Sequence, residues 1–215
     1  LIKITHNGGA EEGAAGLTSQ NGLISSSGDL DITTTGAPGL YATGASGQII
    51  GQRAKIRLGG TPVTSLPAPT PSAAVSPYAI LAIDGGQITL ASADVATAAP
   101  NSYAVLARRA GTVKITGSDG LRSLVATTDD ESHAVYADGA GAAIEITNAD
   151  IETLGIAAQG IRAVSAGSVI ATGARIITTG APVLRDATQP EDALITVAGV
   201  NMLNDIRWAN GVSAE

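Results

Sequence analysis

Short runs in which apolar and polar residues alternate recur along most of the chain. The clearest runs share one pattern: a small residue, an aliphatic residue, any residue and then alanine. The pattern occurs at 39–42, 79–82, 104–107, 134–137 and 160–163, with a weaker copy at 16–19 and a degenerate copy at 182–185. Alternation with a period of two predicts β-strands buried on one side, with Ile80 and Ala82 pointing inward and Leu81 outward.

Two further short strands follow most copies of the pattern. Second strands are expected at 49–50, 88–90, 113–115, 144–146 and 169–171, and third strands at 29–32, 55–58, 94–97, 150–153 and 175–178. Ala82 and Ala107 are 25 residues apart, and Ala137 and Ala163 are 26 apart. This repeat predicts an all-β fold, a right-handed parallel β-helix solenoid with three short strands per coil and about seven coils of about 25 residues.

The whole chain, 1–215, is expected to form a single β-helix segment of a longer protein. One coil is longer than the others, and its extra residues lie mostly at 59–77, where five prolines favour an extended loop excursion. Such a loop is either a tolerated insertion or a partner-binding element, and Leu66 and Pro69 are its candidate contact residues.

Composition narrows the choice of function. The chain has 27 glycines, no cysteine and no phenylalanine, so aliphatic side chains and alanine must fill the core. The net charge is -7 and no basic run is longer than Arg108-Arg109, which argues against nucleic acid as a partner. The longest uncharged run, 58–83, is broken by prolines, so no membrane insertion by this segment is expected. We find no motif for a cofactor, and a lone His133 is poor support for a metal site.

The recurrent strands at 78–82, 103–107 and 134–137, together with 86–90, 111–115 and 172–180, give the chain a family resemblance. They resemble the passenger domains of Gram-negative autotransporters, the pertactin-like adhesins, over about residues 15 to 200. The resemblance implies secretion through the outer membrane to the bacterial cell surface. It also implies a non-catalytic adhesin or virulence factor that binds a host extracellular-matrix, receptor or serum protein.

Two alternatives stay open at this point. One is a self-associating autotransporter module that mediates cell–cell aggregation. The other is a polysaccharide lyase or hydrolase on a pectate-lyase-like β-helix, which would need carboxylates gathered in one lateral cleft. Asp29, Asp94 and Asp150 are expected in one third-strand column with Lys55 and Arg175 interleaved, an alternation more typical of charge balance than of a catalytic pair.

The candidate partner-binding residues lie on the outward side of the first strand. Their expected order along the solenoid is Thr18, Tyr41, Leu81, Leu106, Tyr136 and Arg162. Such an amphipathic stripe is typical of an interface, although a self-stacked ladder or a stripe covered by the loop at 59–77 fits equally well. Arg108 and Arg109 complete the candidate set.

Three smaller features are interpreted as structural. Tyr78, Tyr103 and His133 occupy equivalent positions just before the first strand, as stacked rings would. Lys114 and Glu145 are expected to pair across neighbouring coils, and the acidic run at 129–131 is expected to be a solvated loop rather than a calcium site.

Overall fold

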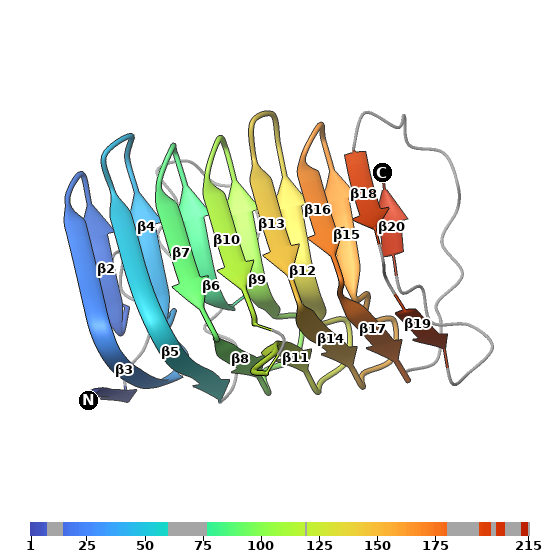
Figure 1. Cartoon of the computed structure of the whole chain (residues 1–215), viewed down its shortest axis with the longest axis horizontal. Coiled ribbons are helices and arrows are strands. Elements are labelled where there is room, and N and C mark those ends of the chain that lie inside the picture. Colours follow the sequence, from blue (N-terminus) through green and yellow to red (C-terminus); the bar gives the residue numbers. More distant parts are fainter. Residues whose placement is uncertain are drawn as a thin grey trace.

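The chain winds into a right-handed parallel β-helix whose three faces run the length of the solenoid (Figure 1). The computed structural model describes residues 1–7, 15–59, 77–118 and 120–179, and the backbone of three further strands at 194–198, 201–204 and 212–214. Every pairing between named strands is parallel, and no helix occurs in these ranges. The predicted fold class is confirmed.

The strands fall into three columns. The first face consists of β2 (Leu17–Gln20), β4 (Leu40–Thr43), β6 (Tyr78–Ile83), β9 (Tyr103–Arg108), β12 (His133–Asp138), β15 (Ile161–Val164) and β20 (Val212–Ala214). The second face consists of the first halves of β3 (Leu23–Thr35) and β5 (Gln48–Gly59), followed by β7 (Gln87–Ala91), β10 (Thr112–Thr116), β13 (Ala143–Thr147), β16 (Ser168–Thr172) and β18 (Leu194–Ala198). The third face consists of β1 (Ile2–Asn7), the second halves of β3 and β5, and β8 (Asp94–Thr97), β11 (Ser123–Thr127), β14 (Ala149–Thr153), β17 (Arg175–Thr178) and β19 (Asn201–Asn204).

Six coils have all three faces within the part of the chain that is described. β1 precedes them on the third face, and β18, β19 and β20 extend all three faces at the other end, in keeping with the predicted number of about seven. The degenerate copy at 182–185 lies outside the described residues. The sequence predicts this copy as the next strand of the first face after β15. In the structure β20, residues 212–214, pairs with β15 at that position.

Aliphatic side chains from successive coils lie directly over one another in the interior. On the first face Leu40 pairs with Ile80, Ile80 with Val105, Val105 with Val135, and Val135 with Ile161. All five are 0% exposed. The stack of strands, about 4.8 Å apart, therefore encloses one continuous aliphatic core, and none of its described members is aromatic.

The corner between the second and third faces is a single residue in a left-handed conformation. Arg53, Ser92, Asn148 and Gly173 occupy it in four of the coils, with φ between 44° and 61°. One such residue bends the chain enough to start the next face, and this explains why β5 runs almost without a break across two faces. In β3 the same turn coincides with a register shift at Asp29.

Glycine precedes most second strands because the neighbouring coil leaves no room for a side chain. A Cβ atom on Gly86 would lie 2.2 Å from the carbonyl oxygen of Ala42, and one on Gly111 would lie 2.0 Å from that of Ala82. Both distances are far below van der Waals contact. At Gly86 and Gly111 a glycine is therefore required by backbone packing between coils.

A column of hydroxyl side chains lies inside the prism where the third face ends. Thr97, Thr127, Thr153 and Thr178 pair in register and are at most 1% exposed. Thr97 shares a hydrogen bond of 2.9 Å with the hydroxyl of Ser102, and Thr127 donates one of 3.1 Å to the carbonyl oxygen of Ser132. The interior thus carries a polar seam at this corner.

Candidate functional site

The outward stripe of the first face has the register that the sequence predicted. Tyr41 pairs with Leu81, Leu81 with Leu106, Leu106 with Tyr136, and Tyr136 with Arg162. The apolar and tyrosine side chains among them belong to, or pack against, a hydrophobic cluster separate from the interior core. All four tyrosines of the chain lie in or against this cluster. We call the cluster with its flanking arginines the aromatic face; its members are Tyr41, Tyr78, Leu81, Ile83, Tyr103, Leu106, Arg108, Tyr136 and Arg162.

The centre of the aromatic face is almost inaccessible to solvent. Leu81 and Leu106 are 4% and 3% exposed, although they point away from the core. Tyr41, Tyr103 and Tyr136 pack against them and remain half-buried. The stripe through Leu81 and Leu106 is therefore covered, which is one of the alternatives that the sequence left open. The described part of this face presents tyrosine rings and arginine.

The predicted ring column is confirmed. Tyr78 pairs with Tyr103 and Tyr103 with His133, so the three side chains follow one another along the solenoid. The ring centroids of Tyr103 and His133 are 5.6 Å apart, and those of Tyr103 and Tyr136 are 4.7 Å apart. His133 is also stacked on Tyr136 at 5.8 Å. Tilted and stacked rings at these distances rigidify the face.

His133 is held within this cluster. Its Nδ1 accepts a hydrogen bond of 3.2 Å from the backbone N–H of Gln159, and its ring is 5% exposed. The guanidinium of Arg162 lies 5.3 Å from the centre of the Tyr136 ring, within reach of a cation–π interaction. These contacts support the structural interpretation of His133.

Burial changes the acidity of two of the tyrosines. Loss of solvent around the hydroxyl raises the pKa of Tyr136 from 10.0 to about 12, against the opposing effect of the nearby positive charge of Arg162. Burial likewise raises the pKa of Tyr78, with Tyr41 adding to the effect. Both hydroxyls therefore stay protonated, as donors, over the whole physiological range.

Arg108 and Arg109 each form an ion pair with a neighbouring coil. Arg108 Nε lies 2.9 Å from Asp138 Oδ2 in the next coil, and Arg109 Nε lies 2.8 Å from Asp84 Oδ1 in the preceding one. The second pair is bidentate, and the hydrogen bond to Asp84 raises the pKa of Arg109. Their guanidinium groups thus have fixed positions beside the aromatic face.

The predicted pair across the second face is confirmed: Lys114 Nζ lies 2.9 Å from Glu145 Oε1, and the two residues are in register. On the third face one prediction was wrong. Lys55 lies opposite Asp31, whereas Asp29 lies opposite Gln52 and pairs with Arg53. The register shifts at Asp29, where β3 turns from the second face to the third, and an alternation count cannot detect such an irregularity.

Several predicted residues give no further site. Leu66 and Pro69 lie outside the described residues, as does most of the loop at 59–77. In the acidic run, Asp130 Oδ1 accepts a hydrogen bond from the backbone N–H of Ile156, which is a contact between coils.

Across the described ranges no group of three or more His, Cys, Asp or Glu side chains is placed to hold a metal ion. The same ranges hold no helix long and apolar enough to span a membrane.

The sequence did not predict two features of the structure. The third strand β11 was not expected, although Val125 sits inward between two outward residues as in the other coils. Arg122, just before it, lies 2.9 Å from Asp150 Oδ1 and donates hydrogen bonds to the carbonyl oxygens of Ala149 and Gly173. Neither β11 nor the role of Arg122 was predicted, because the longer connection between the second and third strands of this coil breaks the regular spacing.

The fold and these faces define a right-handed parallel β-helix with one aromatic side. No family model matches the chain, and a search of curated proteins and one of solved structures found no match either.

Proposed function

We propose that the chain is part of a surface-exposed passenger domain of the autotransporter type and acts as an adhesin through the aromatic face. The observation that carries the proposal is the gathering of all four tyrosines on one side of a rigid solenoid, beside Arg108 and Arg162. Tyrosine and arginine are the residue types enriched where proteins bind one another.

The rigidity of the scaffold favours binding over chemistry on this face. The rings are held by stacking, and Arg108 is held by Asp138, so little side-chain entropy is lost when a partner docks. The partner that fits is a host extracellular-matrix, receptor or serum protein. The style of the repeat supports a route to the bacterial cell surface.

A binding panel tests the proposal. The purified chain is immobilised and exposed to extracellular-matrix and serum proteins, and the variant with Tyr41→Ala and Tyr136→Ala is compared with it. We expect at least one partner, and a loss of about tenfold or more in affinity for the variant, as hot-spot tyrosines give.

The matched control is the variant with Ile50→Ala and Ile170→Ala on the second face, where the two side chains are 39% and 45% exposed. It should bind like the unmodified chain. Absence of binding to every protein of the panel, or equal losses in the two variants, would contradict the proposal.

A further inference from the structure

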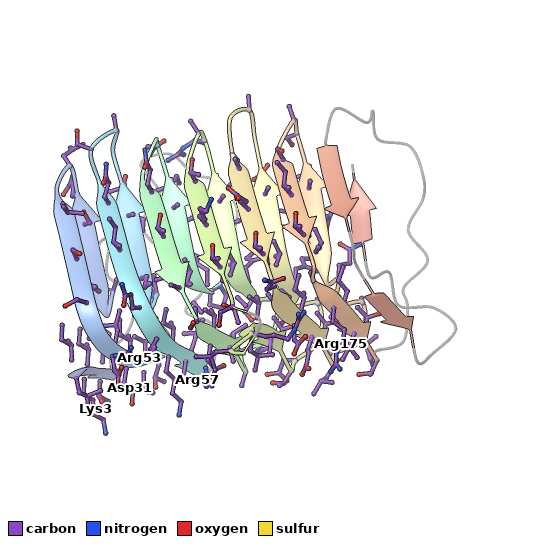
Figure 2. All side chains as sticks on the ribbon, in the orientation of Figure 1. Lys3, Asp31, Arg53, Arg57 and Arg175 are labelled. Carbon is purple, nitrogen blue, oxygen red and sulfur yellow. The ribbon has the colours of Figure 1, made fainter. Side chains whose placement is uncertain are left out.

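The third face carries charges in a regular order along the solenoid, and several lie along its lower side in Figure 2. Each strand presents two outward residues on this face. The leading column consists of Lys3, Asp31, Lys55, Asp94, Leu124, Asp150 and Arg175. The trailing column, two residues further along each strand, consists of Thr5, Thr33, Arg57, Ala96, Ala126, Glu152 and Ile177.

The two columns together make one basic strand and one acidic strand. β5 presents Lys55 and Arg57, whereas β14 presents Asp150 and Glu152. β8 and β11 lie between them in the sheet. The basic and acidic strands are therefore equally far from the line that separates β8 from β11.

This placement makes the face complementary to itself. A second copy could pack with its third face against this one. The two-fold axis that relates the copies would lie between the two faces, parallel to the strands and above the boundary of β8 and β11. The two solenoids would then run antiparallel. Lys55 would then face Asp150 of the second copy, and Arg57 would face Glu152. Because the axis relates the two copies, the same contacts form twice.

The remaining positions agree with the same arrangement. β3 would face β17, which sets Asp31 opposite Arg175. At the centre Ala96 would face Ala126, so short side chains meet there. Asp94, which pairs with Arg57 of its own chain, would face Leu124. No like charges meet directly in either column.

Four of the charges on this face have no ion pair with another residue of the described part of the chain: Lys3, Asp31, Lys55 and Glu152. Lys55 is exposed, and Asp31 and Glu152 are half-exposed. Arg175 lies 3.7 Å from Asp150, too far for a hydrogen bond. A facing copy would supply Asp31, Lys55, Glu152 and Arg175 with an opposite charge.

We propose that two copies of this chain pair face to face through the third face, in antiparallel orientation. The contact uses a different side of the solenoid from the adhesin function and does not depend on it. Six strands at about 4.8 Å give a contact about 29 Å long, at the small end of specific interfaces. Association is therefore reversible, and it weakens as salt screens the exposed pairs.

Charge reversal on each strand tests the pairing. Lys55→Glu with Arg57→Glu makes β5 acidic, and Asp150→Lys with Glu152→Lys makes β14 basic. Sedimentation velocity is measured on the whole chain at increasing concentration, in low and high salt. We expect the unmodified chain to dimerise and each double variant to stay monomeric.

Mixing the two variants gives the decisive result. The first has two acidic strands and the second two basic strands, so both contacts of a mixed pair join opposite charges. We expect the equimolar mixture to dimerise although neither component does so alone. The control variant, Arg109→Glu with Lys114→Glu, makes the same change in net charge as the first double variant but away from the third face, and should dimerise like the unmodified chain.

A chain that stays monomeric up to about 1 mM in low salt, the range of the weakest specific contacts, would overturn the proposal. So would dimers that both double variants retain, or a mixture that stays monomeric while each variant keeps the circular dichroism and melting temperature of the unmodified chain.

Discussion

A Cβ atom on Gly111 would lie 2.0 Å from the carbonyl oxygen of Ala82, one coil earlier. Neither backbone can move aside, because both belong to hydrogen-bonded parallel strands or their immediate flanks. Side-chain-free positions of this kind fix how closely successive coils can stack. The glycine before the second strand is therefore a packing requirement at such positions.

Gly111→Ala is therefore expected to destabilise the chain by about 1–3 kcal/mol, the usual cost of forcing one extra carbon into a packed site. Thermal and urea unfolding measure the change. Gly120→Ala is the control, because a Cβ atom there meets no other atom within 4 Å. Equal effects of the two substitutions would contradict the steric explanation.

The inward columns make a second prediction. Ile80→Ala should cost about 2–5 kcal/mol, because a fully buried side chain leaves a cavity that the stacked neighbours cannot fill. Ile50→Ala, at an outward position that is 39% exposed, should change stability by about 0.5 kcal/mol or less. Urea unfolding of the two variants compares them directly, and a reversed order would contradict the assignment of inward and outward positions.

The polar seam gives a matched pair of substitutions. The hydroxyl of Thr153 is buried and makes no hydrogen bond with the described residues, whereas that of Thr127, in register with it, donates to the carbonyl oxygen of Ser132. Thr153→Val should stabilise the chain by about 1 kcal/mol, because it removes an unpaired buried hydroxyl at nearly constant shape. Thr127→Val should destabilise it by about 1 kcal/mol. Melting temperatures that fall equally in both variants would argue against this difference.

Tyr136 predicts how stability depends on alkaline pH. Its pKa is about 12 in the folded chain and 10.0 when unperturbed, so the folded state holds its proton more tightly. The contribution of this group to stability is complete below pH 10 and is lost as the pH rises toward 12. Urea unfolding at stepped pH should show a shallower loss for Tyr136→Phe. Identical slopes for the two proteins would show that this hydroxyl is not shielded.

The sequence predicted the fold because one physical rule repeats in every coil. Inward residues must be aliphatic and outward ones are free to vary, so Ile80, Val105 and Val135 could be aligned by counting alone. The pair between Lys114 and Glu145 followed from the same count. Counting failed where the chain departs from the repeat, at the register shift beside Asp29 and at the excursion before β11.

The candidate sites were harder to predict than the fold. The outward order through Leu81 and Leu106 was right, but the extent of their burial depends on three-dimensional packing that alternation does not encode. The complementarity of β5 and β14 was also out of reach. It depends on the distance of each strand from the middle of the sheet, and β11 was missing from the predicted stack.

Each coil contacts mainly the coils beside it, so the solenoid works as a molecular ruler. Inserting one repeat of about 25 residues would lengthen it by about 4.8 Å and leave the order of the faces unchanged. Evolution could thereby adjust the span between two patches on one side by duplicating a stretch of gene, without redesigning either patch.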